Sequence, residues 1–590
     1  MPRIPAAFDT EIYVNFTLLL FREIESGKMD SFEYPFDLEA LREYIITHQL
    51  ITFNGMGFDI PLLMLVLQGA GPAFVKHAAN RIIEGHLKPW NFEKEFLVTL
   101  NPPELDHIDL MEVAPLTGSL KLYGGRMHSR HLQDLPVKPD AVVTEEEMAG
   151  LREYCANDLQ TTIDLYHALR EPLALRASMT TEYGIDLRSK SDAQIAEAII
   201  KQEVEKKLGH RLQKPGSMIG NRYFYTVPEW MGFDQLEILD DVRAAEFIVN
   251  DKGSVLIPED LKRKKIQVRD GVYRMGIGGL HSSETNQTKE ADATYGIADF
   301  DVTSYYPTII LNQRLFPPHI GPEFLEVYQG IVDRRIAAKR AKNKSVAESL
   351  KIAVNGSFGK FGSKYSTLYA PGLMIQVTIT GQLALLMLIE ALAQTPGVEV
   401  ISANTDGVTC RYAYVAEGEM MAAVKGWEAR TSFQLERADY RGLYSRDVNN
   451  YIAVKTDGEV KTKGVYGKGL PLHKNPYASI CSQAVIDKVS LGASIAGTIY
   501  ASQDIRKFVC VRKVAHGAIW KGEPLGRVIR WYYSKHELES IHDSINNYLV
   551  PNTEGAKPLM TLPDRIPEDL DREWYIREAT ELYNVLGGVQ

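Results

Sequence analysis

Two aspartates stand where segments with the alternating pattern of β-strands come to an end. Residues 297–302 form one such segment, in which Asp299 and Asp301 share a face. Two more β-rich runs flank residues 404–407, an Asn-Thr-Asp-Gly stretch that favours a hairpin turn. The pattern therefore predicts Asp301 at a strand end and Asp406 at a hairpin tip.

Carboxylates on facing backbone elements have a defined chemistry. Two of them can hold a pair of Mg²⁺ ions roughly 3.5 to 4 Å apart, one activating an attacking hydroxyl and one stabilising a leaving pyrophosphate. Asp301 and Asp406 are the candidates for these ligands. The alternative is that each is an ordinary turn aspartate, a common role for Asp in hairpins.

Cations lie between these aspartates on two predicted helices. In the first helix Arg335 and Lys339 are one turn apart on one face, and Asn343 predicts a turn after it. In the second, Lys351 and Asn355 lie on one stripe. Such a helical hairpin could present cations to a triphosphate, whereas the alternative is a solvated basic face.

Three of these segments resemble motifs of family B DNA polymerases. Residues 301–307 resemble the first palm motif, 351–359 the fingers motif and 404–407 the second palm motif. Asn450-Tyr451 and residues 461–464 resemble, more loosely, the segment with which that family grips the primer-template duplex. The first three motifs agree in order and spacing as well as in residue types.

The resemblance implies a role for each matching residue. Asp301 and Asp406 would be catalytic metal ligands, and Tyr306 would lie under the sugar and exclude a 2′-hydroxyl. The other implied nucleotide-binding residues are Arg335, Lys339, Lys351 and Asn355, and the implied DNA-binding residues are Tyr451, Lys461 and Lys463.

The chain also departs from the family pattern. The family usually has aspartate at Asn404, serine at Gly356 and Gly407, and tyrosine at Phe358. Loss of one carboxylate puts the electrostatics of the site in question, although Asp406 is retained. We expect polymerase activity to survive this loss.

The first third of the chain carries a second constellation. Residues 8–13 are a predicted strand on which Asp9 and Glu11 point the same way. Asp59 follows another apolar run, just before a predicted helix start. A further helix, opened by the capping box of Thr144 and Glu147, carries two residues that share a face, Tyr154 and Asp158.

These acidic groups could bind two metals and orient a water for attack on a phosphodiester. The segments resemble the three motifs of DEDD-type proofreading 3′–5′ exonucleases. By that resemblance Asp9, Glu11 and Asp158 hold metal, Asp59 completes the site and Tyr154 positions the water. Taken singly, each has a structural alternative, such as a helix cap at Asp59 or simple packing of Tyr154.

The resemblance implies an α/β and α+β multidomain fold, in which an RNase H-like exonuclease domain precedes a right-hand polymerase. The predicted domains are an exonuclease at 1–175, a connecting region at 176–290, a palm at 291–330 and 355–480, fingers at 331–354 and a thumb at 481–590. A basic-aromatic stretch that includes Arg530, Trp531, Tyr532 and Tyr533 would be core and rim of the thumb or contact DNA.

Composition limits the class of protein. With 590 residues and 45% hydrophobic residues, the chain can bury several cores. Its net charge of −10 and pI near 5.9 indicate that any DNA binding comes from local basic patches. The four cysteines are too scattered for a disulfide framework or a cysteine-rich zinc site. No apolar run approaches the roughly 20 residues of a membrane span, so we expect a cytoplasmic protein, in a host cytoplasm if viral.

The sequence therefore predicts a DNA-directed DNA polymerase with 3′–5′ exodeoxyribonuclease activity. The expected cofactor is Mg²⁺ or Mn²⁺, two ions per active site, and the expected partners are primer-template DNA, dNTPs and replication accessory proteins. We expect a monomer that extends an existing 3′-hydroxyl in bacteriophage DNA replication. The alternatives are an exonuclease whose degenerate polymerase domain only binds DNA, suggested by Asn404, and a non-catalytic nucleic-acid-binding subunit.

Overall fold

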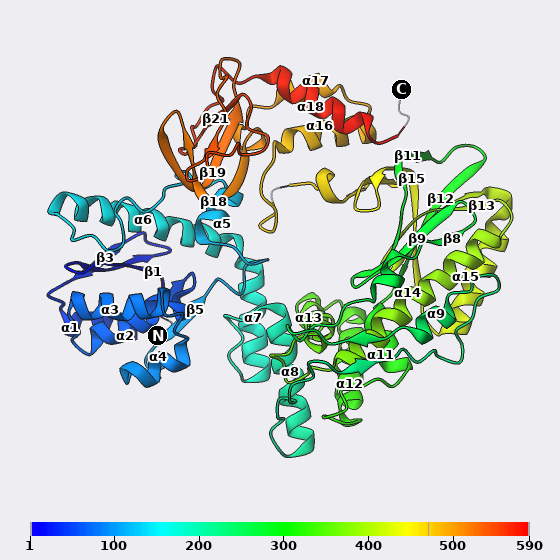
Figure 1. Cartoon of the computed structure of the whole chain (residues 1–590), viewed down its shortest axis with the longest axis horizontal. Coiled ribbons are helices and arrows are strands. Elements are labelled where there is room, and N and C mark those ends of the chain that lie inside the picture. The colour runs from blue at the N-terminus through cyan, green and yellow to red at the C-terminus, as the bar shows by residue number, and fades with distance from the viewer. Residues whose placement is uncertain (1–2, 470, 588–590) are drawn as a thin grey trace. The chain divides into compact units, whose positions relative to one another are not determined.

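The structure is a computed structural model that describes residues 3–469 and 471–587 (Figure 1). It is mixed, with 41% helix and 23% strand. The chain divides into two compact units, each built from separate stretches. The first comprises Met1–Ser191, Gly469–Ile480 and Ile499–Tyr575, and the second comprises Asp192–Lys468, Cys481–Thr498 and Ile576–Gln590. The finer division into five predicted domains stays a prediction.

A five-stranded sheet forms the centre of the N-terminal part of the first unit. Its order is β3-β2-β1-β4-β5, in which β1 runs antiparallel to β2 and parallel to β4. The strands are β1 (Ile4–Ile12), β2 (Thr17–Glu23), β3 (Met29–Glu33), β4 (His48–Thr52) and β5 (Asp106–Asp109). The predicted strand that carries Asp9 and Glu11 is therefore confirmed, and it lies in the middle of the sheet.

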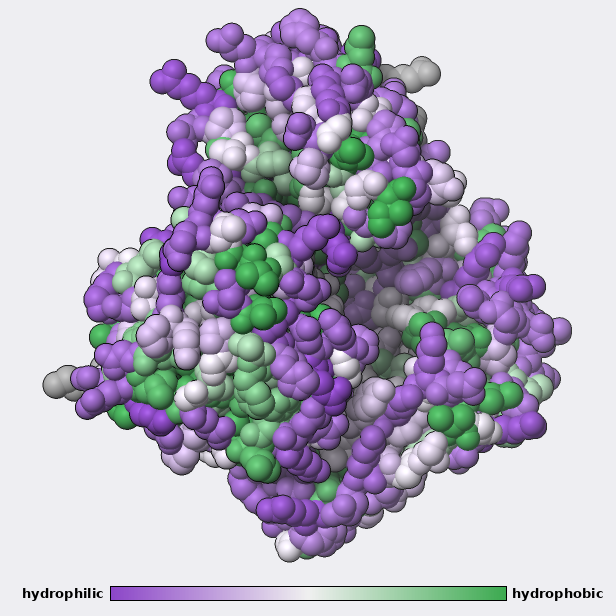
Figure 2. Space-filling view, turned by 60° about the vertical axis from the view of Figure 1, so that its left-hand side comes forward, coloured by the Kyte–Doolittle hydropathy of each residue, from purple (hydrophilic) through white to green (hydrophobic). Residues whose placement is uncertain are grey.

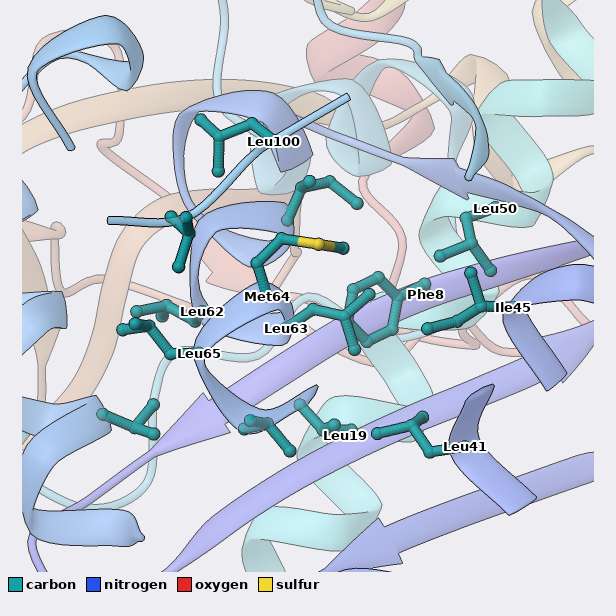
Figure 3. Close-up of a cluster of buried hydrophobic side chains, with 14 of the residues drawn as sticks. Phe8, Leu19, Leu41, Ile45, Leu50, Leu62, Leu63, Met64, Leu65 and Leu100 are labelled. Carbon is teal, nitrogen blue, oxygen red and sulfur yellow. The ribbon is translucent and has the colours of Figure 1, made fainter. Parts of the chain in front are cut away.

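Helices cover both faces of this sheet because β1 alternates its side chains between them. Phe8 packs into a cluster with α1 (Leu38–Thr47), α2 (Asp59–Leu67) and α3 (Pro72–Ile83), and Figure 3 shows Leu63 of α2 beside Phe8. Ala7 packs instead with Leu151 and Cys155 of α6 (Glu145–Ala168). The predicted capping box opens α6 as expected. The remaining helices of this part are α4 (Pro89–Phe96), α5 (Leu120–Met127) and α7 (Arg170–Tyr183).

A second, four-stranded sheet of the first unit has the order β20-β18-β19-β21. Its strands are β18 (Cys510–Trp520), β19 (Glu523–Tyr533), β20 (His542–Asp543) and β21 (Ala556–Pro558). On β19, the side chains of Arg530, Trp531, Tyr532 and Tyr533 are all buried. The core interpretation of this basic-aromatic stretch is thus confirmed, and direct DNA contact by these four side chains is wrong.

Arg530 is buried, and no acidic side chain in the described part of the chain pairs with it. Its guanidinium donates hydrogen bonds to the carbonyl oxygens of Ser129, Arg130, Leu559 and Met560, at 2.8 to 3.1 Å. Burial lowers the pKa of Arg530 to about 10. The side chain therefore joins the end of α5 to the four-stranded sheet within one unit.

The second unit is built on a ten-stranded sheet. Its order is β17-β16-β15-β12-β14-β13-β10-β9-β8, and β11 pairs with β15. The strands are β8 (Ile266–Val268), β9 (Gly271–Gly276), β10 (Gly279–Ser282), β11 (Thr285–Glu290), β12 (Tyr295–Val302), β13 (Val398–Asn404), β14 (Gly407–Ala413), β15 (Leu435–Asp447), β16 (Asn450–Lys455) and β17 (Val460–Thr462). The predicted strand before Asp301 and the hairpin around Asp406 are both confirmed.

The helices between these strands include the predicted hairpin. It consists of α12 (Glu323–Arg340) and α13 (Lys344–Phe361), and Asn343 caps the second helix. Other helices of this unit are α8 (Asp192–Leu208), α9 (Leu239–Ala244), α10 (Glu259–Arg263), α11 (Tyr305–Asn312), α14 (Pro371–Gln394) and α15 (Glu417–Thr431). Three helices contain residues of both units, namely α16 (Ser479–Leu491), α17 (Ile495–Ala501) and α18 (Arg572–Asn584). A small sheet pairs β6 (Arg222–Tyr223) with β7 (Phe247–Ile248).

Helix α14 corrects one sequence-based expectation. It is long and apolar enough to cross a membrane by length and composition, so the expectation that no apolar run approaches that size was wrong. In this structure 83% of the most apolar 18-residue stretch of α14 is buried. Buried core helices of soluble proteins can have the same length and hydropathy as a membrane span.

The face in Figure 2 is mostly hydrophilic, with its hydrophobic residues in separate small groups.

Replacing Arg530 by methionine should destabilise the first unit, since four carbonyl groups lose the donor that the buried guanidinium supplies. We expect the free energy of unfolding to fall by about 3 kcal/mol, measured by urea titration. The matched control is Arg527→Met on the same strand, where the side chain is exposed. Equal stability of the two variants would contradict this role of Arg530.

Candidate active sites

Four carboxylates interact beside the central strand of the first unit, and we call Asp9, Glu11, Asp59 and Asp158 the first acid cluster. Strand β1 supplies Asp9 and Glu11 on the face covered by α6, which supplies Asp158. Asp59 is the first residue of α2 and accepts a 2.7 Å hydrogen bond from Thr10 Oγ1, on the opposite face of β1. The structure thus brings all four predicted residues together.

Tyr154 joins this cluster from one turn before Asp158 on α6. Its side chain is 5% exposed, and the charge of Asp158 acts on it. Burial, together with the charges of Asp158 and Glu11, raises the pKa of Tyr154, so the hydroxyl keeps its proton. The predicted shared face of these two residues is confirmed.

Burial raises the pKa of every carboxyl group in the first acid cluster, and repulsion from other members of the cluster adds to this effect at Asp9 and Glu11. Burial is the largest cause throughout, and it raises the pKa of Glu11 to about 8, of Asp59 to about 7 and of Asp158 to about 6. The pKa of Asp9 also lies well above its ordinary value, because burial and the charges of Asp59 and Asp158 oppose ionisation. A cation at the cluster would relieve this repulsion.

Lys121 is a member of this site that sequence reasoning missed. It stands on α5, and its charge lowers the pKa values of Glu11 and Asp158 against the effect of burial. Its ammonium nitrogen lies 4.7 Å from the centre of the Tyr154 ring and 3.2 Å from Asp134 Oδ1. A single lysine at no distinctive spacing offers no sequence signal for this placement.

The first acid cluster suits a hard divalent cation. Carboxylate oxygens are the ligands that Mg²⁺ and Mn²⁺ prefer. Glu11 is only 8% exposed, yet no described residue donates a hydrogen bond to its carboxylate. An acceptor left in this state is one that a bound cation would satisfy.

A second acid cluster, formed by Asp299, Asp301 and Asp406, lines a cavity of about 590 Å³ in the second unit. Asp301 pairs in register with Gly407 of the facing strand, and the Val302 amide donates to the carbonyl of Asp406. Burial and the charge of Asp299 raise the pKa of Asp301 to about 6, and burial also raises that of Asp406. The strand and the hairpin therefore bring both predicted metal ligands to one cavity.

Asp299 supports this second cluster from deeper in the sheet. It is 6% exposed and accepts hydrogen bonds from Thr409 Oγ1, at 2.7 Å, and from the Tyr440 hydroxyl. These donors hold the carboxylate, so Asp299 acts on Asp301 mainly through its charge.

Lys461 contacts the second acid cluster, although its side chain is 42% exposed. Its ammonium nitrogen is 3.4 Å from Asp299 Oδ2 and 3.6 Å from Asp301 Oδ2. Burial opposes its charge, but the two carboxylates outweigh burial and raise the pKa of Lys461. Tyr451 and Lys463, the other predicted DNA-binding residues, line the same cavity.

A neighbouring cavity of about 380 Å³ is lined by Tyr306, Arg335 and Asn355. It shares Thr405 and Asp406 with the cavity of the second acid cluster. Three predicted nucleotide-binding residues are therefore brought to the same place as a predicted metal ligand.

Lys339 and Lys351, by contrast, are not among the residues that line this smaller cavity. Both are exposed on the helical hairpin, and Lys351 pairs with Glu348 at 3.3 Å. Arg335 differs from them because its guanidinium donates a 3.1 Å hydrogen bond to Ser304 Oγ, within the segment 301–307 that carries Asp301. The contact of Lys339 and Lys351 with a triphosphate stays a prediction.

The departures from the polymerase pattern have local structural reasons. A side chain at Gly407 would place its Cβ 2.3 Å from Asp301 Oδ1, and one at Gly356 would lie 2.8 Å from the Asp192 carbonyl oxygen. The Phe358 ring stacks on Tyr306 with 4.2 Å between centroids. The Asn404 amide donates to the Val448 carbonyl at 3.1 Å, a bond that an aspartate could not make.

No protein-family model matches this sequence, and no curated protein matches it either.

In metal-free solution, Glu11→Gln should stabilise the chain at high pH. The pKa of Glu11 is about 8 in the folded state and 4.5 ordinarily. Between these two pH values the folded state binds more protons than the unfolded state, so it loses stability as pH rises. The variant lacks this penalty. Its free energy of unfolding should exceed that of the wild type by at least about 1 kcal/mol at pH 8 and match it near pH 4.

Urea titration with EDTA at several pH values measures this difference. Glu43→Gln, at an exposed position of α1, is the matched control. A stability difference for Glu11→Gln that does not change with pH would contradict the repulsion inferred here.

Gly407→Ala should impair any reaction at the second acid cluster, since the new methyl group must displace the Asp301 carboxylate. If the activities predicted from the sequence are present, primer extension falls by about tenfold or more, while strand shortening continues. The control is Gly418→Ala on α15, where an added Cβ meets no atom within 4 Å. Unchanged extension would show that Asp301 need not hold its present position.

Proposed function

We propose that this chain is a template-directed DNA polymerase that adds dNTPs to a primer 3′-hydroxyl and carries a separate 3′–5′ proofreading exonuclease. One observation carries the polymerase proposal. The cavity of the second acid cluster and the cavity lined by Tyr306 and Arg335 share the hairpin residues Thr405 and Asp406. A reacting phosphate held there would lie between carboxylates on one side and a guanidinium on the other.

In the polymerase site, Asp301 and Asp406 would hold Mg²⁺ or Mn²⁺, which supply activation of the 3′-hydroxyl and charge neutralisation of the leaving pyrophosphate. Arg335 would bind the triphosphate by charge-assisted hydrogen bonds. Tyr306, held by stacking on Phe358, would close the space beneath the sugar and exclude a 2′-hydroxyl. When a cation binds, the ion pairs of Lys461 with Asp299 and Asp301 would weaken, and Lys461 would then contact the DNA backbone.

In the exonuclease site, Asp9, Glu11 and Asp158 would hold the metal ions. Thr10 fixes the orientation of Asp59 by a hydrogen bond, and Tyr154 lies one turn before Asp158 on α6. Tyr154 would then direct a water molecule toward the terminal phosphodiester. Lys121 would moderate repulsion among the carboxylates and between them and the DNA backbone.

A nuclease with a DNA-binding but inactive polymerase half is the second candidate, since Asn404 stands where the resembling family has aspartate. The hydrogen bond from its amide to Val448 argues for a structural role in the hairpin rather than for a lost ligand. The role in bacteriophage DNA replication rests on resemblance and stays a prediction.

The test is extension of a labelled primer-template with Mg²⁺ and dNTPs. Asp406→Ala should reduce extension by at least about 100-fold and leave shortening intact, and Asp9→Ala should do the reverse. The matched control is Asp240→Ala, an exposed aspartate on α9. Shortening without extension in the wild type would leave the nuclease alone, and extension that survives in Asp406→Ala would contradict the assigned site.

A further inference from the structure

A cysteine faces the first acid cluster from the helix that covers it. Cys155 follows Tyr154 on α6, and its sulfur lies 3.9 Å from Asp9 Oδ2. One ligand atom each from Asp9, Glu11 and Cys155 all lie within 4.8 Å of one another. Within the described part of the chain, this is the one group of three His, Cys, Asp or Glu residues that meets this distance.

The side chains are held in this arrangement by packing. Cys155 is fully buried in the cluster that α6 forms with β1 and β2. Glu11 is more than nine-tenths buried and points into the same group, and no described residue donates a hydrogen bond to it. Independently of the cysteine, a carboxylate that is mostly buried and has no protein donor offers oxygen atoms that a cation at this position would satisfy.

The mixture of ligands favours a particular class of cation. Mg²⁺ seeks oxygen ligands in octahedral geometry, whereas Zn²⁺ and Cd²⁺ accept thiolate together with carboxylate in tetrahedral sites. Tetrahedral bonds of about 2.0 to 2.3 Å place ligand atoms roughly 3.5 Å apart. The present separations are close enough for side-chain rotation to bring the three atoms onto one ion.

We propose that Asp9, Glu11 and Cys155 form a binding site for thiophilic divalent cations, such as Zn²⁺ or Cd²⁺, which compete with Mg²⁺ there. As the metal–sulfur bond forms, the thiol S–H bond breaks and its proton passes to solvent, with no change of oxidation state. An ion held by the sulfur would draw Asp9 and Glu11 away from the geometry that Mg²⁺ needs. That inhibitory consequence rests on the proposed exonuclease function, whereas the binding does not.

The experiment titrates the full chain with Cd²⁺ and follows the ultraviolet sulfur-to-cadmium charge-transfer absorbance. We expect a band that saturates at one equivalent in the wild type and is lost in both Cys155→Ser and Cys155→Ala, with affinity for Cd²⁺ at least about tenfold weaker. Cys410→Ser is the matched control, because Cys410 is buried in the other unit beside Met420. No band in the wild type, or an equal band without Cys155, would overturn the site.

A second arm measures shortening of labelled DNA in Mg²⁺ with added Cd²⁺, normalised to the rate of each variant without Cd²⁺. Inhibition should require about tenfold more Cd²⁺ when Cys155 is replaced. Equal sensitivity of wild type and variant would refute the competition with Mg²⁺. A saturable band in a protein that never shortens DNA would support the metal site and count against the exonuclease instead.

Discussion

Repulsion between carboxylates that have been removed from water is the interaction on which both candidate sites depend. Each acid cluster gathers negative charge on adjacent backbone elements, and burial raises the pKa of Asp9 and Glu11 in the first cluster and of Asp301 and Asp406 in the second. One lysine compensates each cluster in part, Lys121 in the first and Lys461 in the second. A fold that holds such groups together pays in stability for a site that divalent cations can complete.

The surrounding structure can be understood as the frame that bears this repulsion. In the first unit, Asp9 and Glu11 stand on the middle strand of a sheet whose two faces are covered by α2 and α6. In the second, Asp301 and the Asp406 hairpin belong to three neighbouring strands, and hydrogen bonds from Thr409 and Tyr440 fix the deeper Asp299. Rigid strands hold like charges close where loops would let them separate.

The sequence predicted what depends on local pattern. Alternation on β1 and β12, the Asn-Thr-Asp-Gly turn and the capping box of α6 each follow from a few adjacent residues, and the structure has each of them. Contacts between segments that are distant along the chain could not be predicted from the sequence. Lys121, Cys155 and the carbonyl partners of Arg530 take their places through packing, which no spacing along the chain encodes. Helix α14 shows an error of another kind, because its length and hydropathy are properties of the sequence itself and only its burial depends on packing.

Binding of Mn²⁺, counted by electron paramagnetic resonance, tests most directly whether the two acid clusters are separate cation sites. The account predicts that the wild type binds ions in two groups, that Asp9→Asn removes one group, and that Asp406→Asn removes the other. Binding that is unchanged in both variants, or that is lost entirely in either one, would contradict it.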